Sequence, residues 1–199
     1  MRLGIVSDIH CNIAGLREAL TVMGPIDELL CLGDIIDRTR FSNDVVALLK
    51  DLDARIILGN HDEAFLASMD PERADRDGVD KELVAFLAGQ PHRRMLTYGR
   101  KKLLMIHSTP WEPRGEYIFP HNEKLALFAE AGADYVLYGH THAHVVTRIG
   151  GVLVVNPGSA GEGRDSSDGR HLSCAVLDTV ADEARMIHYM DPRFPTSRA

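Results

Sequence analysis

Five short polar clusters contain the residue types that bind divalent metals and transfer protons. Aspartate, asparagine and histidine dominate them, and each cluster directly follows a short run rich in Leu, Ile and Val. The clusters are Asp8-Ile9-His10, Gly33-Asp34, Gly59-Asn60-His61-Asp62, His107 and Gly139-His140-Thr141-His142. Buried strands that end in carboxylates or imidazoles gather those groups at one sheet edge, where open α/β sheets bind ligands. The pattern therefore predicts a metal centre suited to phosphoester hydrolysis.

The donor types restrict the metal. Imidazole, carboxylate and amide ligands without thiolate suit Mn²⁺, Fe, Zn²⁺, Co²⁺ or Ni²⁺. We expect two divalent ions per chain, with Mn²⁺ the first choice, because one carboxylate can bridge two cations at about 3.5–4 Å. Such ions would lower the pKa of a bridging water towards about 7, and the resulting hydroxide would attack phosphorus in line.

The segments between these clusters alternate between helix and strand patterns. We expect helices over residues 13–23, 42–50, 62–69, 79–88 and 122–131, and a loop over the charged segment 69–78. A hairpin is expected around residues 98–101, and only strand signals follow His142. The order predicts one α/β domain, residues 1–199, with two mixed β-sheets packed face to face and helices outside.

The composition limits the classes of partner. The 199 residues are 45% hydrophobic and 26% charged, which is typical of a globular domain. The net charge of −7 argues against a stable nucleic-acid complex, whereas bound cations would reverse the local charge and admit a small phosphoester. We expect neither a signal peptide nor a membrane span, and therefore a cytoplasmic protein. The sequence makes no prediction about oligomeric state.

The motifs D-x-H, GD-x-x-D, GNHD and GH-x-H, with a lone histidine after a strand, resemble the signature of the calcineurin-like metallophosphoesterase superfamily. The match runs from Asp8 to His142, and the β-rich remainder is similar to small bacterial and archaeal phosphodiesterases of that superfamily. The resemblance implies a four-layer α/β/β/α sandwich with two metals at the ends of the central strands. It implies Asp8, His10 and His142 as ligands of the first metal, Asn60, His107 and His140 as ligands of the second, and Asp34 as the bridge.

The resemblance also implies roles beside the metals. His61 would protonate the leaving group as a general acid without binding metal. Asp62 would accept a hydrogen bond from the other ring nitrogen of His61, although it is also suited to cap a helix. Arg38 would hold phosphate, as in relatives with GD-x-x-DRG, but Thr39 replaces that glycine here.

The segment 108–120 contains the only tryptophan, Trp111, together with Arg114. Because it follows a ligand strand directly, we expect it to overhang the metals and to contact substrate through these two residues. The alternative is a loop that packs its own aromatic side chains. His144, two residues beyond His142, is expected to be a strand residue rather than a ligand.

We therefore predict a binuclear metal-dependent phosphoesterase. Phosphodiesters are the expected substrates, because the compact chain has no recognisable added specificity domain. A phosphomonoesterase, including a phosphoprotein phosphatase, and a dinucleoside polyphosphate hydrolase are the enzymatic alternatives. A non-catalytic binding scaffold is disfavoured, because every expected ligand and His61 are present.

Overall fold

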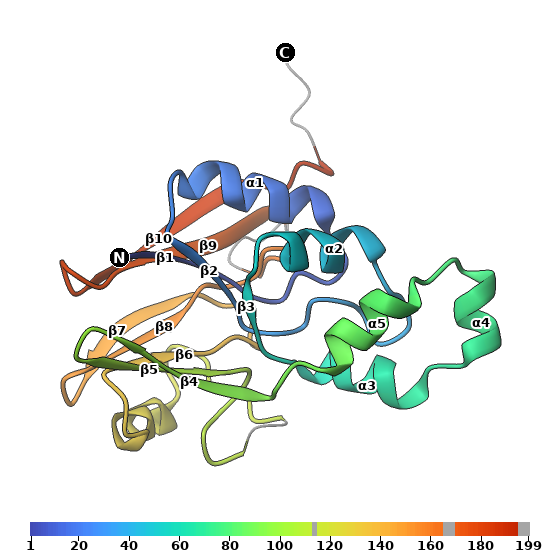
Figure 1. The fold of residues 1–199 in the computed structure, drawn as a ribbon. Coiled ribbons are helices and arrows are strands. Elements are labelled where there is room, and N and C mark those ends of the chain that lie inside the picture. The colour runs from blue at the N-terminus through green and yellow to red at the C-terminus, as the bar shows by residue number, and fades with distance from the viewer. Residues whose placement is uncertain (113–114, 165–169, 195–199) are drawn as a thin grey trace.

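Two five-stranded sheets lie one on the other in the computed structural model, which describes residues 1–112, 115–164 and 170–194. Helices cover the outer face of each sheet, so that four layers follow one another in Figure 1. The strand order is β10-β9-β1-β2-β3 in the first sheet and β4-β5-β6-β8-β7 in the second. The predicted α/β/β/α arrangement of two mixed sheets is confirmed.

The first sheet combines parallel strands at one side with antiparallel strands at the other. Its members are β1 (Arg2–Val6), β2 (Glu28–Cys31), β3 (Arg55–Ile56), β9 (His171–Asp178) and β10 (Glu183–Met190). β1, β2 and β3 pair in parallel, and β9 lies antiparallel between β1 and β10. The carboxyl ends of β1, β2 and β3 therefore lie at one edge, which is where three of the predicted clusters begin.

The second sheet repeats this design. Its members are β4 (Arg93–Tyr98), β5 (Lys101–Ile106), β6 (Tyr135–Leu137), β7 (Val145–Ile149) and β8 (Val152–Asn156). β5, β6 and β8 pair in parallel, and β4 and β7 are antiparallel edge strands. The predicted hairpin joins β4 to β5 and turns at Gly99, whose φ of 61° favours glycine. Two more clusters follow the carboxyl ends of β5 and β6.

Polar side chains cap the start of several described helices. The described helices are α1 (Ile13–Met23), α2 (Asn43–Asp51), α3 (Asn60–Ser68), α4 (Pro71–Arg76), α5 (Lys81–Ala88) and the 3₁₀ helix η1 (Glu123–Glu130). Asn12 caps α1 by accepting from the Gly15 amide at 2.9 Å, and Ser42 and Asp80 cap α2 and α5 in the same way. Within the described residues, no helix is long and apolar enough to cross a bilayer.

Two predicted segments differ from the structure. The expected loop 69–78 contains α4, which begins with Pro71 at the position where a helix needs no amide donor. Asp70 supports this start by accepting from the Glu72 amide at 3.0 Å. The expected α-helix 122–131 is a 3₁₀ helix in which only Phe128 is buried, so packing does little to favour the α geometry.

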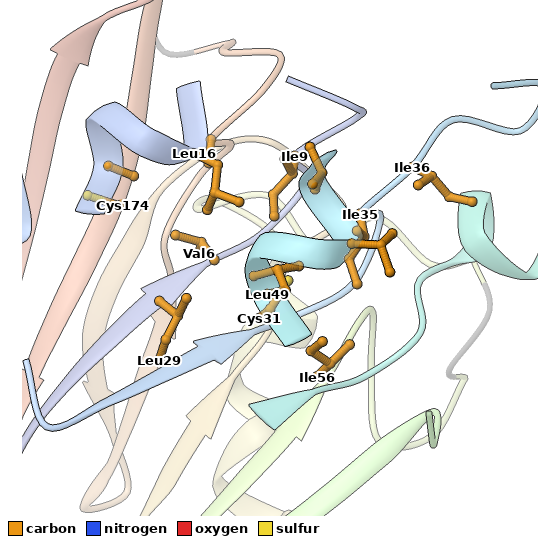
Figure 2. Close-up of a cluster of buried hydrophobic side chains, with 14 of the residues drawn as sticks. Val6, Ile9, Leu16, Leu29, Cys31, Ile35, Ile36, Leu49, Ile56 and Cys174 are labelled. Atoms are coloured by element: carbon orange, nitrogen blue, oxygen red, sulfur yellow. The ribbon is translucent and has the colours of Figure 1, made fainter. Parts of the chain in front are cut away.

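Three hydrophobic clusters separate the four layers. Leu3 and Ile5 of β1 point between the sheets, whereas Val6 contacts the helix layer with Leu16 of α1 (Figure 2). Phe128 of η1 packs on the outer face of the second sheet. Because the central strands β1, β2, β6 and β8 are buried on both faces, they are held firmly and their carboxyl ends are fixed in space.

Candidate metal centre

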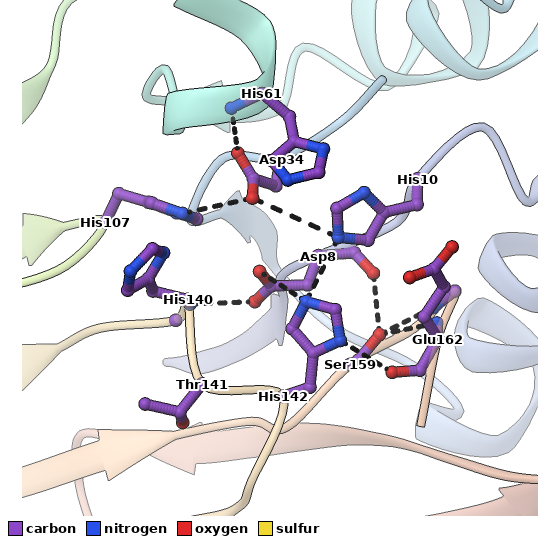
Figure 3. Close-up of polar contacts among 12 residues, drawn as sticks. Asp8, His10, Asp34, His61, His107, His140, Thr141, His142, Ser159 and Glu162 are labelled. Atoms are coloured by element: carbon purple, nitrogen blue, oxygen red, sulfur yellow. Dashed lines mark hydrogen bonds and ion pairs between the residues drawn. The ribbon is translucent and has the colours of Figure 1, made fainter. Parts of the chain in front are cut away.

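The predicted ligands converge from both sheets at the carboxyl ends of the strands (Figure 3). Three groups of side chains bring potential ligand atoms within 4.8 Å of one another. The groups are Asp8 with His10 and His142, Asp34 with His107 and His140, and His10 with Asp34 and His61. Residues that lie up to 134 positions apart in the chain therefore face one small volume.

The ligand loops adopt an unusual backbone conformation. Five predicted ligands have positive φ: Asp8 (53°), His10 (46°), Asp34 (51°), His140 (67°) and His142 (57°). Residues other than glycine rarely adopt these angles, and such strain persists where the surroundings enforce it. Here backbone hydrogen bonds cross between loops, from the Asp8 amide to the Gly33 carbonyl and from the His10 amide to the Asp34 carbonyl, both at 3.0 Å.

Two motif glycines allow these loops to approach closely. A Cβ at Gly59 would lie 2.2 Å from Asp34 Oδ1, and one at Gly139 would lie 2.0 Å from Ser7 Oγ. Any side chain at either position would push a ligand loop away. The glycines of GNHD and GHTH are therefore required for the position of the neighbouring ligands.

The first group is oriented by a contact outside it. His142 Nδ1 donates to the Glu162 carbonyl at 2.8 Å, so its Nε2 points inward, 3.3 Å from Asp8 Oδ1 and 3.1 Å from His10 Nε2. The Gly161 carbonyl, one residue before Glu162, accepts from Arg193 Nη2 at 2.6 Å. The hydrogen bond from His142 Nδ1 to the Glu162 carbonyl is of the kind that fixes the tautomer of a metal-binding histidine.

The second group follows the same rule. His107 Nδ1 donates to the Leu32 carbonyl at 2.7 Å, and Nε2 lies 3.3 Å from Asp34 Oδ2 and 3.1 Å from Asn60 Oδ1. Burial would lower the pKa of His107, but the Asp34 carboxylate raises it to about 10. A cation entering here would replace the proton on Nε2.

Asp34 lies between the two groups. Its Oδ2 is 3.3 Å from His107 Nε2 and 4.0 Å from His10 Nε2, while Oδ1 accepts from the His61 amide at 2.8 Å. Burial alone would raise the pKa of Asp34, but the charge and hydrogen bond of His107 hold it well below its usual range. The carboxylate is therefore ionised and faces both groups.

Orphaned polar atoms show that the site fits metal ions. Asp8 Oδ1 and His140 Nε2 are buried and have no hydrogen-bond partner among the described residues. Burial and the His107 charge lower the pKa of His140 to about 4, so its ring is neutral at pH 7. A neutral, inward-facing imidazole such as that of His140, beside ionised carboxylates, is a ligand that borderline divalent cations prefer.

His61 lies at the side of this cluster, at the start of α3. Its ring makes an edge contact with that of His10, with centroids 4.7 Å apart. Burial lowers the pKa of His61, and the charges of His10 and Arg38 lower it further, whereas the Asp34 carboxylate partly raises it. His61 Nδ1 is buried and lacks a hydrogen-bond partner among the described residues.

The predicted contact between Asp62 and the His61 ring is wrong. Asp62 Oδ1 accepts from the Ile35 and Ile36 amides at 2.9 and 3.0 Å, and Oδ2 accepts from the Gly59 amide at 2.9 Å. The carboxylate thus caps α3 and joins this helix to the loop after β2. Burial and the Asp34 charge raise its pKa to about 7. Asp62 therefore holds the loop after β2 and the start of α3 together.

Asp37 is a contact of the centre that the predicted site lacked. Its Oδ1 lies 3.2 Å from His10 Nδ1, outside hydrogen-bonding geometry, and its Oδ2 accepts from Arg40 Nη2 at 2.6 Å. The motif GD-x-x-D contains this aspartate and was the signal in the sequence that could have identified it.

Arg38 is exposed on the same loop. His144 is exposed, and its ring contacts that of His188 at 4.8 Å; it lies directly before β7 rather than in the strand as predicted, and it is in none of the three ligand groups.

In the segment 108–120, Trp111 makes contacts that hold the segment itself. Its ring packs on Phe128 with centroids 5.3 Å apart, and Nε1 donates to Glu116 at 2.6 Å. Arg114 lies outside the described residues. Tyr117 contacts the centre through its ring, which stacks on that of His140 at 3.9 Å, and this residue is 45% exposed. Its exposed edge borders the metal centre.

Comparison with known proteins decides the family. A model of the calcineurin-like phosphoesterase superfamily domain matches residues 1–182. The chain belongs to this superfamily. The match covers every predicted ligand, and it makes the chain a phosphoester hydrolase of a family that depends on divalent metals.

Proteins with similar sequences come from Methanocaldococcus jannaschii. One, named a phosphodiesterase, is 25% identical over 169 residues, which cover 79% of this chain and 83% of that protein. Another, an uncharacterized protein, is 27% identical over 192 aligned positions, and the match covers 82% of this chain and 77% of that protein. The crystal structure of a metallophosphoesterase from Sphaerobacter thermophilus superposes with a TM-score of 0.78 at 25% identity, covering 96% of this chain and 89% of that one.

Proposed function

We propose that this protein is a binuclear metal-dependent phosphodiesterase. The observation that carries the proposal is the position of Asp34, an ionised carboxylate whose Oδ2 faces His107 of one group and His10 of the other. A carboxylate shared in this way can hold two cations at the separation that phosphoester hydrolysis requires.

The ligand set divides around Asp34. Asp8, His10 and His142 would hold the first ion, and Asn60, His107 and His140 the second. When bound, two divalent ions supply a water nucleophile at neutral pH and neutralise the phosphoryl oxygens. The two aspartates offset only part of the charge of two such ions, so a chain with a net charge of −7 presents a cationic site to phosphate. Mn²⁺ is the first ion to test.

The residues beside the ligands complete the reaction. His61 would donate a proton to the leaving-group oxygen, since its ring lies at the edge of the cluster and does not depend on a hydrogen bond to Asp62. Arg38 is an exposed cation close enough to affect the His61 ring, and would hold the phosphoryl group as the bond breaks. Asp62 acts by positioning α3.

The preference for diesters rests on two observations. A relative that covers most of this chain is named a phosphodiesterase. The rim of the centre is also exposed at Arg38 and Tyr117, which leaves space for a second ester group on the phosphate. A small phosphoester is therefore the proposed substrate.

The test is hydrolysis by the full chain after its metals are removed with a chelator and single metals are restored. Bis(4-nitrophenyl) phosphate, 4-nitrophenyl phosphate and a dinucleoside polyphosphate should be compared with Mn²⁺, Fe²⁺, Zn²⁺, Co²⁺ and Ni²⁺. We expect two bound ions per chain by elemental analysis and the highest kcat/KM on the diester. One bound ion, or faster cleavage of the monoester, would contradict the proposal.

A further inference from the structure

A cavity of about 600 Å³ lies between the loop after β2 and the segment that joins α3 to α4. Its more buried lining is apolar and consists of Phe41, Phe65, Met69, Ala74 and Val79. Its exposed lining is polar and includes Arg38, Arg40, Ser68, Asp70 and Asp77. The volume lies within the range of small-molecule sites, about 300–1,000 Å³, and is larger than one aromatic ring requires.

The walls of this cavity are continuous with the metal centre. Phe65 follows His61 by four residues on α3, so both side chains lie on one face of the helix. On the opposite wall, Arg40 Nη2 donates to the His10 carbonyl at 3.3 Å and to Asp37 Oδ2 at 2.6 Å. The segments that line the cavity therefore also carry His61 and hold the loop of His10.

Arg38 stands at the junction of the cavity and the centre. It lines the cavity and directly follows Asp37, whose Oδ1 lies 3.2 Å from His10 Nδ1. It forms no hydrogen bond or ion pair with another described residue, whereas Arg40 beside it is held by Asp37. A free guanidinium beside an apolar cavity is suited to a ligand with a phosphate at one end and an apolar group at the other.

We propose that this cavity, which we call the aryl pocket, binds a planar aromatic group of up to nucleoside size that is esterified to the phosphate at the metal centre. The Phe41 and Phe65 rings, 5.5 Å apart and tilted by 39°, provide an aromatic wall for stacking. Met69 adapts to the edge of the ligand, and Arg38 binds its phosphate. The inference rests on the proposed function and names its substrate class, phosphodiesters with an aromatic ester group.

The experiment compares two phosphates that differ only by an aromatic base. Adenosine 5′-monophosphate and ribose 5-phosphate are measured as competitive inhibitors of methyl 4-nitrophenyl phosphate hydrolysis by the Mn²⁺-loaded full chain. The wild-type protein should bind the adenosine compound about tenfold more tightly, as expected for one stacked base. The ratio of the two inhibition constants is the readout, because it cancels the shared interaction with phosphate.

Matched variants assign that ratio to the aryl pocket. Ser68→Trp fills the pocket from an exposed position of α3 and should bring the ratio close to one. Ala67→Trp places the same bulk on the next residue, which is exposed and does not line the pocket, and should leave the ratio unchanged. Phe41→Leu keeps an apolar wall without the ring and should lower the ratio, whereas Arg38→Ala should weaken both inhibitors equally.

A ratio near one in the wild-type protein would overturn the aryl pocket. So would a tenfold ratio that survives both Ser68→Trp and Phe41→Leu, or one lost equally in Ala67→Trp. If the metal-loaded protein cleaves no diester, the proposed function fails by itself. Calorimetric titration of the same two phosphates would then still decide whether the aryl pocket recognises the base.

Discussion

The metal centre and the rim around it are built in different ways. The predicted ligands are mostly buried, five have positive φ, and hydrogen bonds between loops hold their backbone. At the rim, Arg38 and Tyr117 are exposed side chains on loops beside the ligands. We infer that the backbone holds the proposed metal ligands in place, whereas exposed side chains at the rim would select the substrate.

The strongest test of this division removes the shared carboxylate at the centre. Asp34→Asn should lower metal content at both positions and reduce turnover by roughly 10³-fold or more, since loss of a single hydrogen-bond donor to a transition state already costs about 10²–10³-fold. Elemental analysis and diester hydrolysis measure the two effects. A variant that retains two tightly bound ions would show that Asp34 is not the bridge.

His61 tests the border between centre and rim. His61→Ala should keep both metals and lower turnover by roughly 10²–10⁴-fold, the usual contribution of a positioned proton donor. The loss should shrink for nitrophenolate, a good leaving group, and grow for alkoxides. Rates across a series of leaving groups, with metal content alongside, provide the measurement. An equal loss across the series would mean that His61 stabilises phosphate charge instead.

Asp37 should show a smaller effect that is confined to one metal. The negative charge of Asp37 lies 3.2 Å from His10 Nδ1 and favours the orientation of this ring. Asp37→Asn should therefore lower the affinity for the first metal by roughly 10–100-fold, as is usual for a residue that orients a ligand. Asp44→Asn is the control, since it removes the same charge from an exposed position on α2. Metal titration followed by calorimetry distinguishes them, and equal behaviour of the two variants would contradict the orienting role.

Tyr117 should show the smallest effect. Tyr117→Leu removes the ring that stacks on His140 but keeps its apolar bulk, so affinity for the second metal should fall about two- to tenfold, the value of one aromatic pair. Phe119→Leu removes a similarly exposed ring that stacks on Tyr117 and should leave metal affinity unchanged. Losses of the same size in both would assign the effect to the loop rather than to the stack.

The proximity of the predicted ligands followed from the sequence, because each motif directly follows an apolar strand. A residue that directly follows a strand can be located as soon as the position of that strand in the sheet is known. The contacts of Asp62 and Tyr117 were beyond such reasoning, since they depend on loops that meet only in three dimensions. Asp62 has the sequence context of both a helix cap and a histidine partner, and the amides of Ile35 and Ile36, 26 or more positions away, decide between them.

The hydrogen bond between His142 and Glu162 has a consequence for the order of folding. Glu162 belongs to a turn whose preceding carbonyl is held by Asn12 from one end of the chain and Arg193 from the other. Contacts so distant in sequence form late, because the chain must first close its longest loops. We therefore expect the proposed first metal position to be completed only when the last strands have docked, so that a partly assembled chain would bind this metal weakly.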